Sequence, residues 1–402
     1  MYDAIVVGAR CAGSPTAMLL AKKGYRVLLV DKSTFPSDMV MSTHLIHQPG
    51  IARLQRWGLL DRVRSSNCPP VARYDIDLGP FTLTGSPPPA DRVAEGYSPR
   101  RTVLDKILVE AAVEAGAELR EGFSIRDVVT DGKRVTGVRG SAKGGSTSAE
   151  KARIVIGADG MHSIVARRVR APEYNAKPPL QGTYFTYWSG VPMRGLELYI
   201  REHRAIYGWL TNDGLALVGA NWTARDFPRI RRDVERNYFT VLEFCAPGLA
   251  QRVRNGKREG RWIGGAIRNF FRRPYGPGWA LVGDAGYTKD PCTAEGITDA
   301  FRDAEFLVDA IDDGLSGRRP LDESLTDYER RRNDVAMPVY EFTCQLAPFD
   351  PPPPEMLQLY NALRGNQAET DRFCGLIAQT ASIPEFFAPE NIQRIIGAGS
   401  RG

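Results

Sequence analysis

The sequence predicts an α/β fold in which a parallel sheet, assembled from distant parts of the chain, is interrupted by a mostly antiparallel sheet and followed by C-terminal helices. Three observations predict it. Residues 1–32 have the pattern strand, glycine turn, helix, strand, which is typical of a βαβ unit. Two later apolar strands, at residues 153–156 and 279–282, also end in turns that contain glycine and aspartate. Between them, residues 181–222 are rich in aromatic side chains and have the pattern of antiparallel strands.

The first unit is predicted to bind an anion. Residues 4–7 form a short apolar run that suits a strand buried on both faces. A glycine turn at residues 8–13 leads into a helix over residues 14–23, whose N-terminus presents free N–H groups and a partial positive charge to a pyrophosphate. A second strand, residues 26–30, ends at Asp31, where a carboxylate can accept the hydroxyl groups of a ribose.

The turn departs at one position from the G-x-G-x-x-G pattern of dinucleotide sites. It has the sequence GARCAG, so Arg10 replaces the second glycine, and its guanidinium offers charge-assisted hydrogen bonds to phosphates. A βαβ turn without a ligand is the alternative, because short glycine motifs also occur without function. The candidate cofactor-binding residues of this unit are Gly8, Arg10, Cys11, Ala12, Gly13, Ser14, Asp31 and Lys32.

Composition excludes several classes of protein. Of the 402 residues, 43% are hydrophobic and 25% charged, as in ordinary soluble globular proteins. The formal charge of +6 suits an anionic cofactor, and the arginine clusters are short and mixed with acids, so no nucleic-acid partner is expected. The six cysteines lack CxxC spacing, which argues against a metal site and a disulfide framework. Because no leader segment or membrane-spanning run is recognised, a cytoplasmic protein without an integral membrane segment is expected.

The other elements follow from hydrophobic periodicity. Residues 51–63 are predicted to contain an amphipathic helix that ends around Trp57-Gly58. Further helices are predicted over residues 102–115, 231–244, 294–315 and 325–346, with two or three short helices after a proline-rich break at residues 351–354. Strands are predicted over residues 118–120, 125–130, 134–139 and 262–270. The dipeptide Asp131-Gly132 is a hairpin signal between two of these strands.

These elements divide the chain into a Rossmann-like nucleotide domain, an inserted substrate domain and a C-terminal segment. The nucleotide domain is expected to comprise residues 1–71, 99–174 and 273–330. The inserted, mostly antiparallel β-sheet domain comprises residues 72–98 and 175–272. Residues 331–402 form the C-terminal helices, which are expected to cap the substrate domain or to form a homodimer contact.

Three buried strands thus end in turns of ligand-binding type, at residues 8–13, 157–160 and 283–284. In a doubly wound sheet the carboxyl ends of the strands converge on one crevice, so the three turns can serve one extended cofactor. With GADGMHSIVAR at 157–167 and GDAGYTKDPCTAEGITDAFRDA at 283–304, the chain resembles the class A flavoprotein monooxygenases, the group of para-hydroxybenzoate hydroxylase.

The resemblance implies a Rossmann-like FAD-binding domain, FAD as the cofactor and NADPH or NADH as the reductant. It implies a monooxygenase that hydroxylates an aromatic or polyketide-like small molecule through a flavin C4a-hydroperoxide. On the same basis Asp284 bonds the ribityl chain, and a helix start near Gly296 and Ile297 faces the flavin N1 and C2 oxygen, where its positive end favours negative charge. The other implied cofactor contacts are Arg101, Asp159, Gly160 and Pro291.

The substrate is expected beside the aromatic strands. Tyr207 and Trp209 lie two positions apart and therefore on one face of a strand, with ordinary sheet core as the alternative. His44 and His47 lie in STHLIHQPG, a region that in the family passes close to the flavin, and either can act as a base or pack against the cofactor. The predicted catalytic residues are His47 and Tyr207, and the predicted substrate-binding residues are His44, Tyr184 and Trp209.

Two other flavin chemistries stay open. Flavin-dependent halogenases share the fold, but their W-x-W-x-I-P signature is missing, and YGWL at 207–210 is the nearest match. Geranylgeranyl reductases are similar in YGWL and in PCTAEGI, which would make the protein a reductase of isoprenoid double bonds at a membrane surface. A non-catalytic FAD-holding protein is the least favoured alternative, and no metal is expected.

Overall fold

A mostly parallel sheet carries the N-terminal turn. Its strands are β1 (Tyr2–Val7), β2 (Val27–Val30), β7 (Glu118–Arg120), β10 (Ser148–Gly157), β19 (Tyr275–Gly276) and β20 (Trp279–Leu281). In the computed structural model, which describes residues 1–399, they are ordered β19–β20–β10–β1–β2–β7, and β19 alone runs antiparallel to its neighbour in that order. β1, β10 and β20 therefore end at the same edge, which confirms the α/β fold class.

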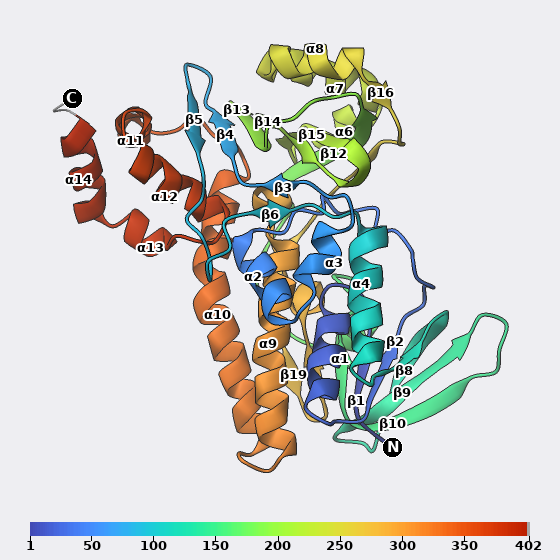
Figure 1. The fold of residues 1–402 in the computed structure, drawn as a ribbon. Coiled ribbons are helices and arrows are strands. Elements are labelled where there is room, and N and C mark those ends of the chain that lie inside the picture. The colour runs from blue at the N-terminus through green and yellow to red at the C-terminus, as the bar shows by residue number, and fades with distance from the viewer. Residues whose placement is uncertain (400–402) are drawn as a thin grey trace.

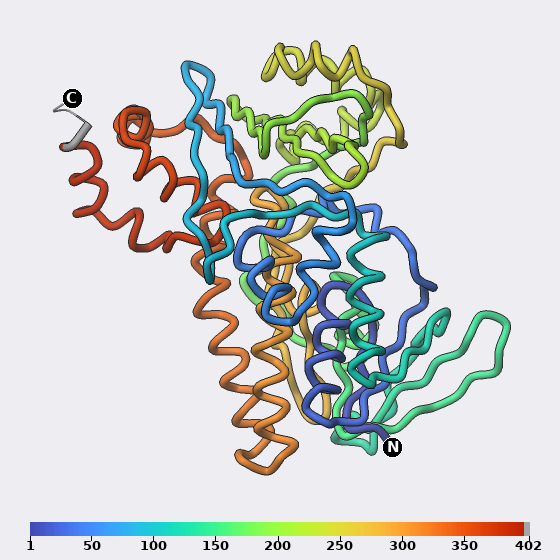
Figure 2. The backbone as a smooth tube through the Cα atoms, viewed as in Figure 1, coloured from blue at the N-terminus to red at the C-terminus, as the bar shows by residue number. Residues whose placement is uncertain are grey.

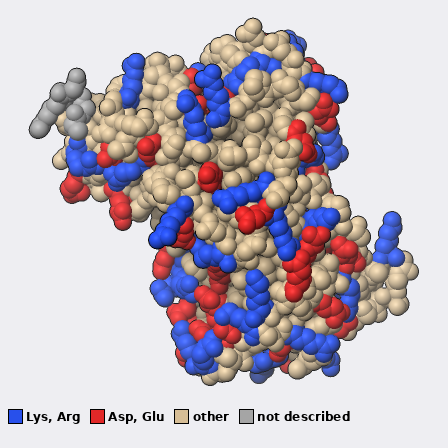
Figure 3. Space-filling view, viewed as in Figure 1, with Lys and Arg blue, Asp and Glu red and all other residues tan. Residues whose placement is uncertain are grey.

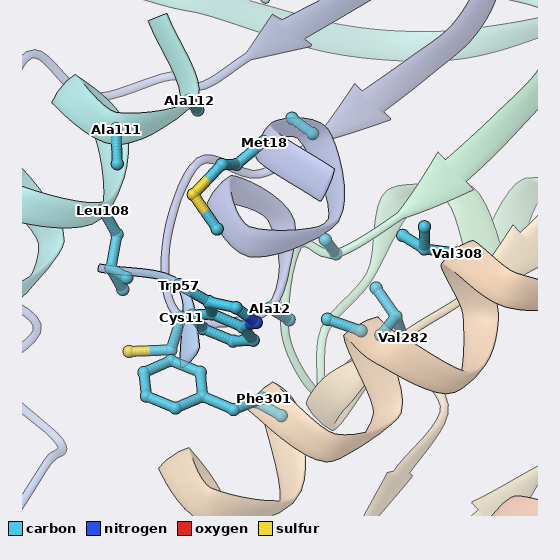
Figure 4. Close-up of a cluster of buried hydrophobic side chains, with 14 of the residues drawn as sticks. Cys11, Ala12, Met18, Trp57, Leu108, Ala111, Ala112, Val282, Phe301 and Val308 are labelled. Carbon is cyan, nitrogen blue, oxygen red and sulfur yellow. The ribbon is translucent and has the colours of Figure 1, made fainter. Parts of the chain in front are cut away.

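Helices cover one face of this sheet (Figure 1). Met18 packs in one apolar cluster with Leu108, and Trp57 lies beside Phe301 with ring centroids 5.1 Å apart (Figure 4). Burial of these side chains positions the first helix, and with it the glycine turn that precedes it. The helices of this layer are α1 (Gly13–Lys22), α4 (Arg101–Glu114) and α9 (Gly296–Leu315).

The opposite face is covered by a hairpin and a short helix. The hairpin strands β8 (Phe123–Thr130) and β9 (Val135–Ala142) pair antiparallel with each other. β9 also pairs antiparallel with the first half of β10. Gly132 in the connecting turn has φ +98°, a conformation that favours glycine, so the hairpin prediction is confirmed. The helix α5 (Ile164–Arg168) packs against β8 and β10.

A second sheet forms the upper part of the molecule in Figure 1, and the tube in Figure 2 shows its two sources, in light blue and in green to yellow. Its order is β16–β12–β15–β14–β13–β4–β5, with β17 also beside β12, and only the β13–β4 pair is parallel within the part of the chain that the structure describes. Its strands are β4 (Tyr74–Asp77), β5 (Thr82–Gly85), β12 (Gln181–Ser189), β13 (Leu196–Arg201), β14 (Arg204–Leu210), β15 (Ala216–Thr223), β16 (Lys257–Arg258) and β17 (Ile263–Ala266).

The two faces of the second sheet have different neighbours. Helices α6 (Phe227–Ile230), α7 (Val234–Cys245) and α8 (Pro247–Asn255) cover the outer face. The inner face packs against the loop around His44 and, through β4 and β5, against the C-terminal helices. An aromatic side chain can therefore reach the nucleotide domain only from the inner face, and strand parity decides which residues do so.

The C-terminal part is more helical than expected. After α10 (Leu321–Leu346), four helices follow rather than two or three: α11 (Pro354–Arg364), α12 (Gln367–Ile377), α13 (Ile383–Phe386) and α14 (Pro389–Gly399). α11 and α12 contact β5, so this segment covers one edge of the second sheet. Among residues 1–399, no helix is both long and apolar enough to cross a membrane.

The helix predicted to end around Trp57-Gly58 is α2 (Gln48–Arg56), which stops there because Gly58 has φ +77° and breaks the helical path. The rest of the 51–63 segment forms a separate helix, α3 (Leu60–Arg64). The strand predicted over residues 262–270 is β17 followed by β18 (Asn269–Arg272). These pair with different sheets, since β18 lies between β11 (Glu173–Lys177) and β21 (Tyr287–Thr288).

Candidate active site

The turn between β1 and α1 has no room for a side chain at either of its glycines, Gly8 and Gly13. A Cβ on Gly13 would lie 1.7 Å from the carbonyl oxygen of Gly8, and a Cβ on Gly8 would lie 2.4 Å from that of Ala158. Gly8 has φ +105° and donates its N–H to the Val30 carbonyl over 2.8 Å. The first and second motifs therefore touch, as a shared cofactor site requires.

The start of α1 carries an unpaired hydroxyl. Ser14 is fully buried, and its Oγ has no hydrogen-bond partner within residues 1–399. The residue before the helix, Ala12, provides no side-chain cap, and Pro15 has no N–H. The Ser14 N–H donates to the Arg10 carbonyl over 2.9 Å, so among residues 1–399 the donors left for a ligand at this helix start are the Gly13 N–H and the Ser14 hydroxyl. A buried free hydroxyl beside the positive end of a ten-residue helix suits an anionic pyrophosphate.

Arg10 lies elsewhere than predicted. Its guanidinium forms an ion pair with Asp105 at 2.5 Å, donates to Ser37 Oγ at 3.0 Å, and lies over the Phe35 ring. It therefore tethers the loop after β2 to α4. A contact of Arg10 with phosphates stays a prediction, and in this arrangement its side chain positions the loop.

Cys11 and Ala12 contribute backbone rather than side chains to the turn. The Cys11 side chain points into the apolar cluster of Figure 4, where burial raises the pKa of its thiol. Ala12 packs in the same cluster, near Val282. A Cβ on Gly283 would come within 2.7 Å of the Ala12 Cβ, so the third motif also touches the first.

Asp31 closes the turn from the end of β2. Its carboxylate accepts hydrogen bonds from the N–H groups of Ala9 and Ser33, each over 2.8 Å. The remaining lone pairs of the two oxygens leave it able to accept a ribose hydroxyl as well. The side chain of Lys32 is exposed.

A buried ion-pair group connects α4 to the third motif. The Arg101 guanidinium bonds the Asp105 carboxylate at 2.8 Å, and Asp105 is completely buried. The positive charge of Arg101 also acts on Asp284, in the turn after β20. Desolvation raises the pKa of Asp284 to about 6, although Arg101 and Lys289 lower it. Asp284 as a residue is exposed, which is the situation of a side chain on the wall of a crevice.

Asp159, in the second motif, has one carboxylate oxygen without a hydrogen-bond partner among residues 1–399. Its Oδ2 accepts the N–H of Ile164 over 2.6 Å, whereas its Oδ1 is buried and unpartnered in the described part of the chain. Desolvation by burial raises the pKa of this carboxyl group. Gly160, next to it, has φ +79° and open space where a Cβ would stand. The turn thus leaves a free acceptor and room beside it.

The start of α9 is open as well. A Cβ on Gly296 would meet no atom within 4 Å, and Glu295 before it makes no side-chain cap. Ile297 follows in the first turn, and the short helix η3 (Pro291–Thr293) precedes it. The α9 N–H groups are therefore available to an electron-rich ligand atom.

Below this helix start, charged side chains pair with one another. Lys289 is buried between Asp299 and Glu295, and Arg302 bonds Asp299 at 2.8 Å. These cations hold the pKa of Asp299 well below its usual range, whereas burial raises that of Glu295 to about 7. Because its ammonium is used in these pairs, Lys289 is not free to attract a substrate.

These groups fit FAD. The Ser14 hydroxyl and the starts of α1 and α9 supply donors for anionic or electron-rich atoms, and Arg101 supplies a fixed positive charge. Three carboxylates at the ends of parallel strands can accept ribose and ribityl hydroxyl groups, namely Asp31, Asp159 and Asp284. The helix start at Gly296 would favour negative charge on the flavin.

On the substrate side, Tyr207 and Trp209 stack on the inner face of β14 with ring centroids 5.5 Å apart. The Trp209 indole N–H donates to Ser98 Oγ at 2.9 Å, and the Tyr207 hydroxyl bonds Thr183 Oγ1 at 2.8 Å. A Cβ on Gly219 would lie 2.2 Å from the Tyr207 ring, so this glycine lets the ring lie across the sheet. The pair predicted to share a face does so.

These side chains form one wall of a cavity whose other wall is the loop before α9. The space open to the centre of a water molecule is about 40 Å³, enough for about three waters. Its lining comes from the second sheet, from Thr43, from the Pro291–Thr293 turn with Ala294, and from the end of α12: Thr43, Thr183, Leu196, Leu198, Tyr207, Trp209, Asn221, Pro291, Cys292, Thr293, Ala294 and Ile377.

Tyr184 lies on the other face. It alternates with Thr183 along β12 and packs in the outer cluster, where its ring lies 5.2 Å from Phe227 and 6.5 Å from Trp222. The prediction that Tyr184 contacts substrate is therefore wrong for this arrangement, because side chains of neighbouring strand residues point to opposite faces.

Both predicted histidines are buried and paired. His47 donates from Nε2 to the Thr293 carbonyl at 2.9 Å, so its Nδ1 accepts the Tyr74 hydroxyl at 2.7 Å. His44 bonds Tyr187 through Nε2, and its Nδ1 has no partner among residues 1–399. Burial lowers the pKa of His47 to about 4 and that of His44 to about 3. Since both ring nitrogens of His47 are occupied, the geometry favours a positioning role over that of a base.

His47 is expected to make stability fall in acid. Folding lowers the pKa of His47 from 6.5 to about 4. Between pH 4 and pH 6.5 this residue is therefore protonated in the unfolded chain and neutral in the folded chain. Stability from this residue is complete above pH 6.5 and is lost as the pH falls toward 4, by up to about 1.4 kcal/mol per pH unit. Urea unfolding of His47→Gln against wild type at several pH values checks this. A constant difference between the two proteins would contradict it.

Comparison with known proteins gives the family. A family model described as "FAD binding domain" matches residues 1–224, so the chain belongs to this family and is an FAD-dependent oxidoreductase. The digeranylgeranylglycerophospholipid reductase of Methanothrix thermoacetophila is 26% identical over 348 residues, 82% of each chain.

Solved structures agree on the fold. The flavin-dependent brominase Bmp2 has a TM-score of 0.81 at 18% identity, covering 100% of this chain and 99% of its own. PqsL from Pseudomonas aeruginosa, described as "a probable FAD-dependent monooxygenase", has a TM-score of 0.72 at 20% identity, covering 93% and 99%. These likenesses show the class A flavoprotein fold.

Some site residues were missed by the sequence analysis. Asp105, four residues after Arg101 on one helix, could have been found from the i,i+4 spacing of opposite charges. Thr183 and Asn221 carry no such signal, because they face the cavity only through the pairing of β12 with β15. Tyr74 and Tyr187, the histidine partners, likewise depend on tertiary contacts.

Proposed function

We infer that the protein is an FAD-dependent monooxygenase that hydroxylates a small aromatic substrate, with NADPH or NADH as reductant. Reduced FAD, when bound, would supply the activation of O₂ for transfer of one oxygen atom to the substrate. The observation that carries this proposal is the cavity between the Tyr207 and Trp209 rings and the loop that leads to Gly296. A ring bound there would lie between aromatic side chains and the start of α9.

The protein groups around the cavity support oxygen transfer in two ways. Its walls are mostly apolar, and an apolar wall keeps water from a reactive oxidant. His44 and Tyr187, which adjoin this region, are bonded to each other and stay uncharged near neutral pH, because burial lowers the pKa of the imidazole and raises that of the phenol. Neither adds a charge that would draw water in. The small size of the space means that the walls must separate to admit a ring.

A second candidate is reduction of a C=C bond. It is favoured by the curated reductases that match about four fifths of the chain at 24–27% identity. An isoprenoid chain is long and flexible, whereas the cavity as it stands holds about three waters. We therefore rank this function second.

Incorporation of oxygen from O₂ into the product distinguishes the monooxygenase function from reduction of a C=C bond. The FAD-loaded protein is supplied with NADPH or NADH, ¹⁸O₂ and a panel of phenols, and the products are analysed by mass spectrometry. One ¹⁸O atom in a hydroxylated product, with nucleotide oxidation that depends on the phenol, is expected. If anaerobic reduced enzyme instead adds two hydrogens to a geranylgeranyl lipid and no phenol takes up ¹⁸O, the monooxygenase proposal is wrong.

A further inference from the structure

The residue before α9 carries a buried carboxyl group that the FAD contacts described above leave unused. Glu295 is 1% exposed and directly precedes Gly296, the first residue of the helix. Its Oε2 accepts the Thr293 hydroxyl over 3.0 Å and lies 3.1 Å from the Lys289 ammonium. Its Oε1 is buried and has no hydrogen-bond partner among residues 1–399. A buried polar atom without a hydrogen bond is costly, so this oxygen needs an explanation.

One ammonium is shared here by two carboxyl groups. Lys289 contacts Asp299 as well as Glu295. Asp299 also bonds Arg302 at 2.8 Å and accepts the Gln379 side-chain amide over 2.9 Å. Asp299 therefore keeps its charge, because the cations hold its pKa well below the usual range. Glu295 has only its share of Lys289, and burial raises its pKa to about 7.

The other groups around Glu295 keep one charge state near neutral pH. Burial raises the pKa of Tyr74, from β4, and of Cys292, from η3, so the phenol and the thiol stay protonated. Burial lowers the pKa of His47 to about 4, so its imidazole is neutral. Burial also lowers the pKa of Lys289, but the two carboxyl groups beside it raise this pKa overall, so its ammonium stays charged. Of these groups, Glu295 is the one whose charge a ligand can change.

The helix start beside Glu295 is where the flavin is expected. The N–H groups there would favour negative charge on the flavin, whereas an ionised carboxylate one residue before the helix opposes it. Two negative charges in one buried site repel each other, and a proton on the carboxylate removes the repulsion. Because Oε2 already accepts two bonds, the proton belongs on Oε1, where the new O–H becomes a donor to an electron-rich ligand atom.

We propose that Glu295 couples the redox state of the flavin to a proton: it is ionised beside oxidised FAD and protonated at Oε1 beside the reduced, negatively charged flavin. The nicotinamide loses two electrons and one proton to the flavin, and Glu295 takes a second proton from water. Glu295 returns this proton to water when the flavin is reoxidised. The inference goes beyond the proposed function, because it needs FAD at the start of α9 but no particular substrate. It holds for oxygen transfer and for C=C reduction alike.

The test measures the midpoint potential of bound FAD by anaerobic spectroelectrochemistry at several pH values above the pKa of Glu295. Each proton that accompanies the two electrons changes the reduction equilibrium about tenfold per pH unit, which is about 30 mV. Wild type is expected to show two protons, a change of about a hundredfold or about 59 mV per pH unit. Glu295→Gln is isosteric and uncharged at every pH, and its oxygen can accept the bonds from Thr293 and Lys289. It is expected to show one proton, a change of about tenfold per pH unit.

Infrared difference spectroscopy gives a second measurement that does not depend on the potential. Reduction of the wild-type flavoprotein above the pKa of Glu295 is expected to add the C=O band of a protonated carboxylic acid, and Glu295→Gln is expected to lack this band. Glu110→Gln is the matched control, because Glu110 lies on the exposed side of α4, where it pairs with Lys106 at 3.7 Å. This control is expected to behave as wild type in both measurements.

The outcomes separate this inference from the proposed function. A wild type that shows one proton, or gains no carboxylic acid band, overturns the inference whether or not the variant folds. A folded, FAD-containing Glu295→Gln protein with the wild-type pH dependence also overturns it and assigns the proton to another group, such as Asp290, whose pKa burial raises to about 7. If the second proton depends on Glu295 while no phenol takes up ¹⁸O, the inference stands and the monooxygenase function fails.

Discussion

A Gly13→Ala variant is expected to be purified without FAD and to unfold at a much lower temperature than wild type. The added Cβ would lie 1.7 Å from the Gly8 carbonyl oxygen and 3.1 Å from the Ala158 Cβ. The clash is with backbone, so the turn itself must move, and it carries both the start of α1 and the contact with the second motif. A loss of about 3 kcal/mol or more in the free energy of unfolding is expected.

The measurements are the FAD absorbance per chain and the thermal unfolding midpoint. Gly248→Ala is the matched control: it lies in α8, where a Cβ would meet no atom within 4 Å and where alanine is the better helix former. Its stability is expected to be unchanged or raised by up to about 1 kcal/mol. A Gly13→Ala protein with full FAD content would contradict the assignment of the pyrophosphate to this turn.

An Arg101→Met variant is expected to be nearly as damaging, for an electrostatic reason. Arg101 is 7% exposed and neutralises Asp105, which is completely buried. Methionine keeps the apolar part of the side chain but leaves Asp105 with Arg10 as its remaining ion-pair partner. Removing one member of a buried ion pair costs about 3–5 kcal/mol. The pKa of Asp284, which Arg101 lowers, is expected to rise further.

FAD retention and urea unfolding check this second prediction. Arg62→Met is the control, because Arg62 pairs with Glu114 at the surface, where an ion pair contributes little. It is expected to bind FAD and unfold as wild type does. If Arg101→Met kept both its FAD and its stability, the fixed positive charge assigned to this site would be unnecessary.

On one face of the molecule (Figure 3), surface charges of both signs are mixed. On the face shown in Figure 3, basic and acidic side chains are interspersed over the nucleotide domain. No group of three or more histidine, cysteine, aspartate or glutamate side chains that could hold a metal ion occurs in the part of the chain described, residues 1–399.

Local sequence was sufficient for the parallel sheet. β1, the Gly8 to Gly13 turn and α1 follow from a continuous apolar run, a glycine turn and helical spacing, all within 23 residues. A continuous apolar run buried on both faces, followed by a glycine turn and helical spacing, is compatible with few structures other than a βαβ unit. The same holds for Asp159 and Asp284, since each directly follows an apolar strand.

Contacts between distant segments decided the rest. Arg10 was expected at the phosphates, but its guanidinium contacts Asp105, 95 positions away, which also pairs with Arg101. Tyr184 was expected at the substrate, but strand parity turns it to the outer face. Neither outcome can be read from a short motif, since both depend on which elements pack together.

The sequence by itself therefore determined the fold class and the three strand-end turns, because these rest on local backbone geometry and on apolar periodicity. FAD as the cofactor was implied by the resemblance of the motifs at these turns. The tertiary structure alone decided which side chains meet in the cavity, which histidine nitrogens are occupied, and which side-chain oxygens of Asn221, Gln181 and Asp290 stay unpaired among residues 1–399. The physical reason is that hydrogen bonding and pKa depend on neighbours that the register of β12 and β15 and the loop before α9 bring together.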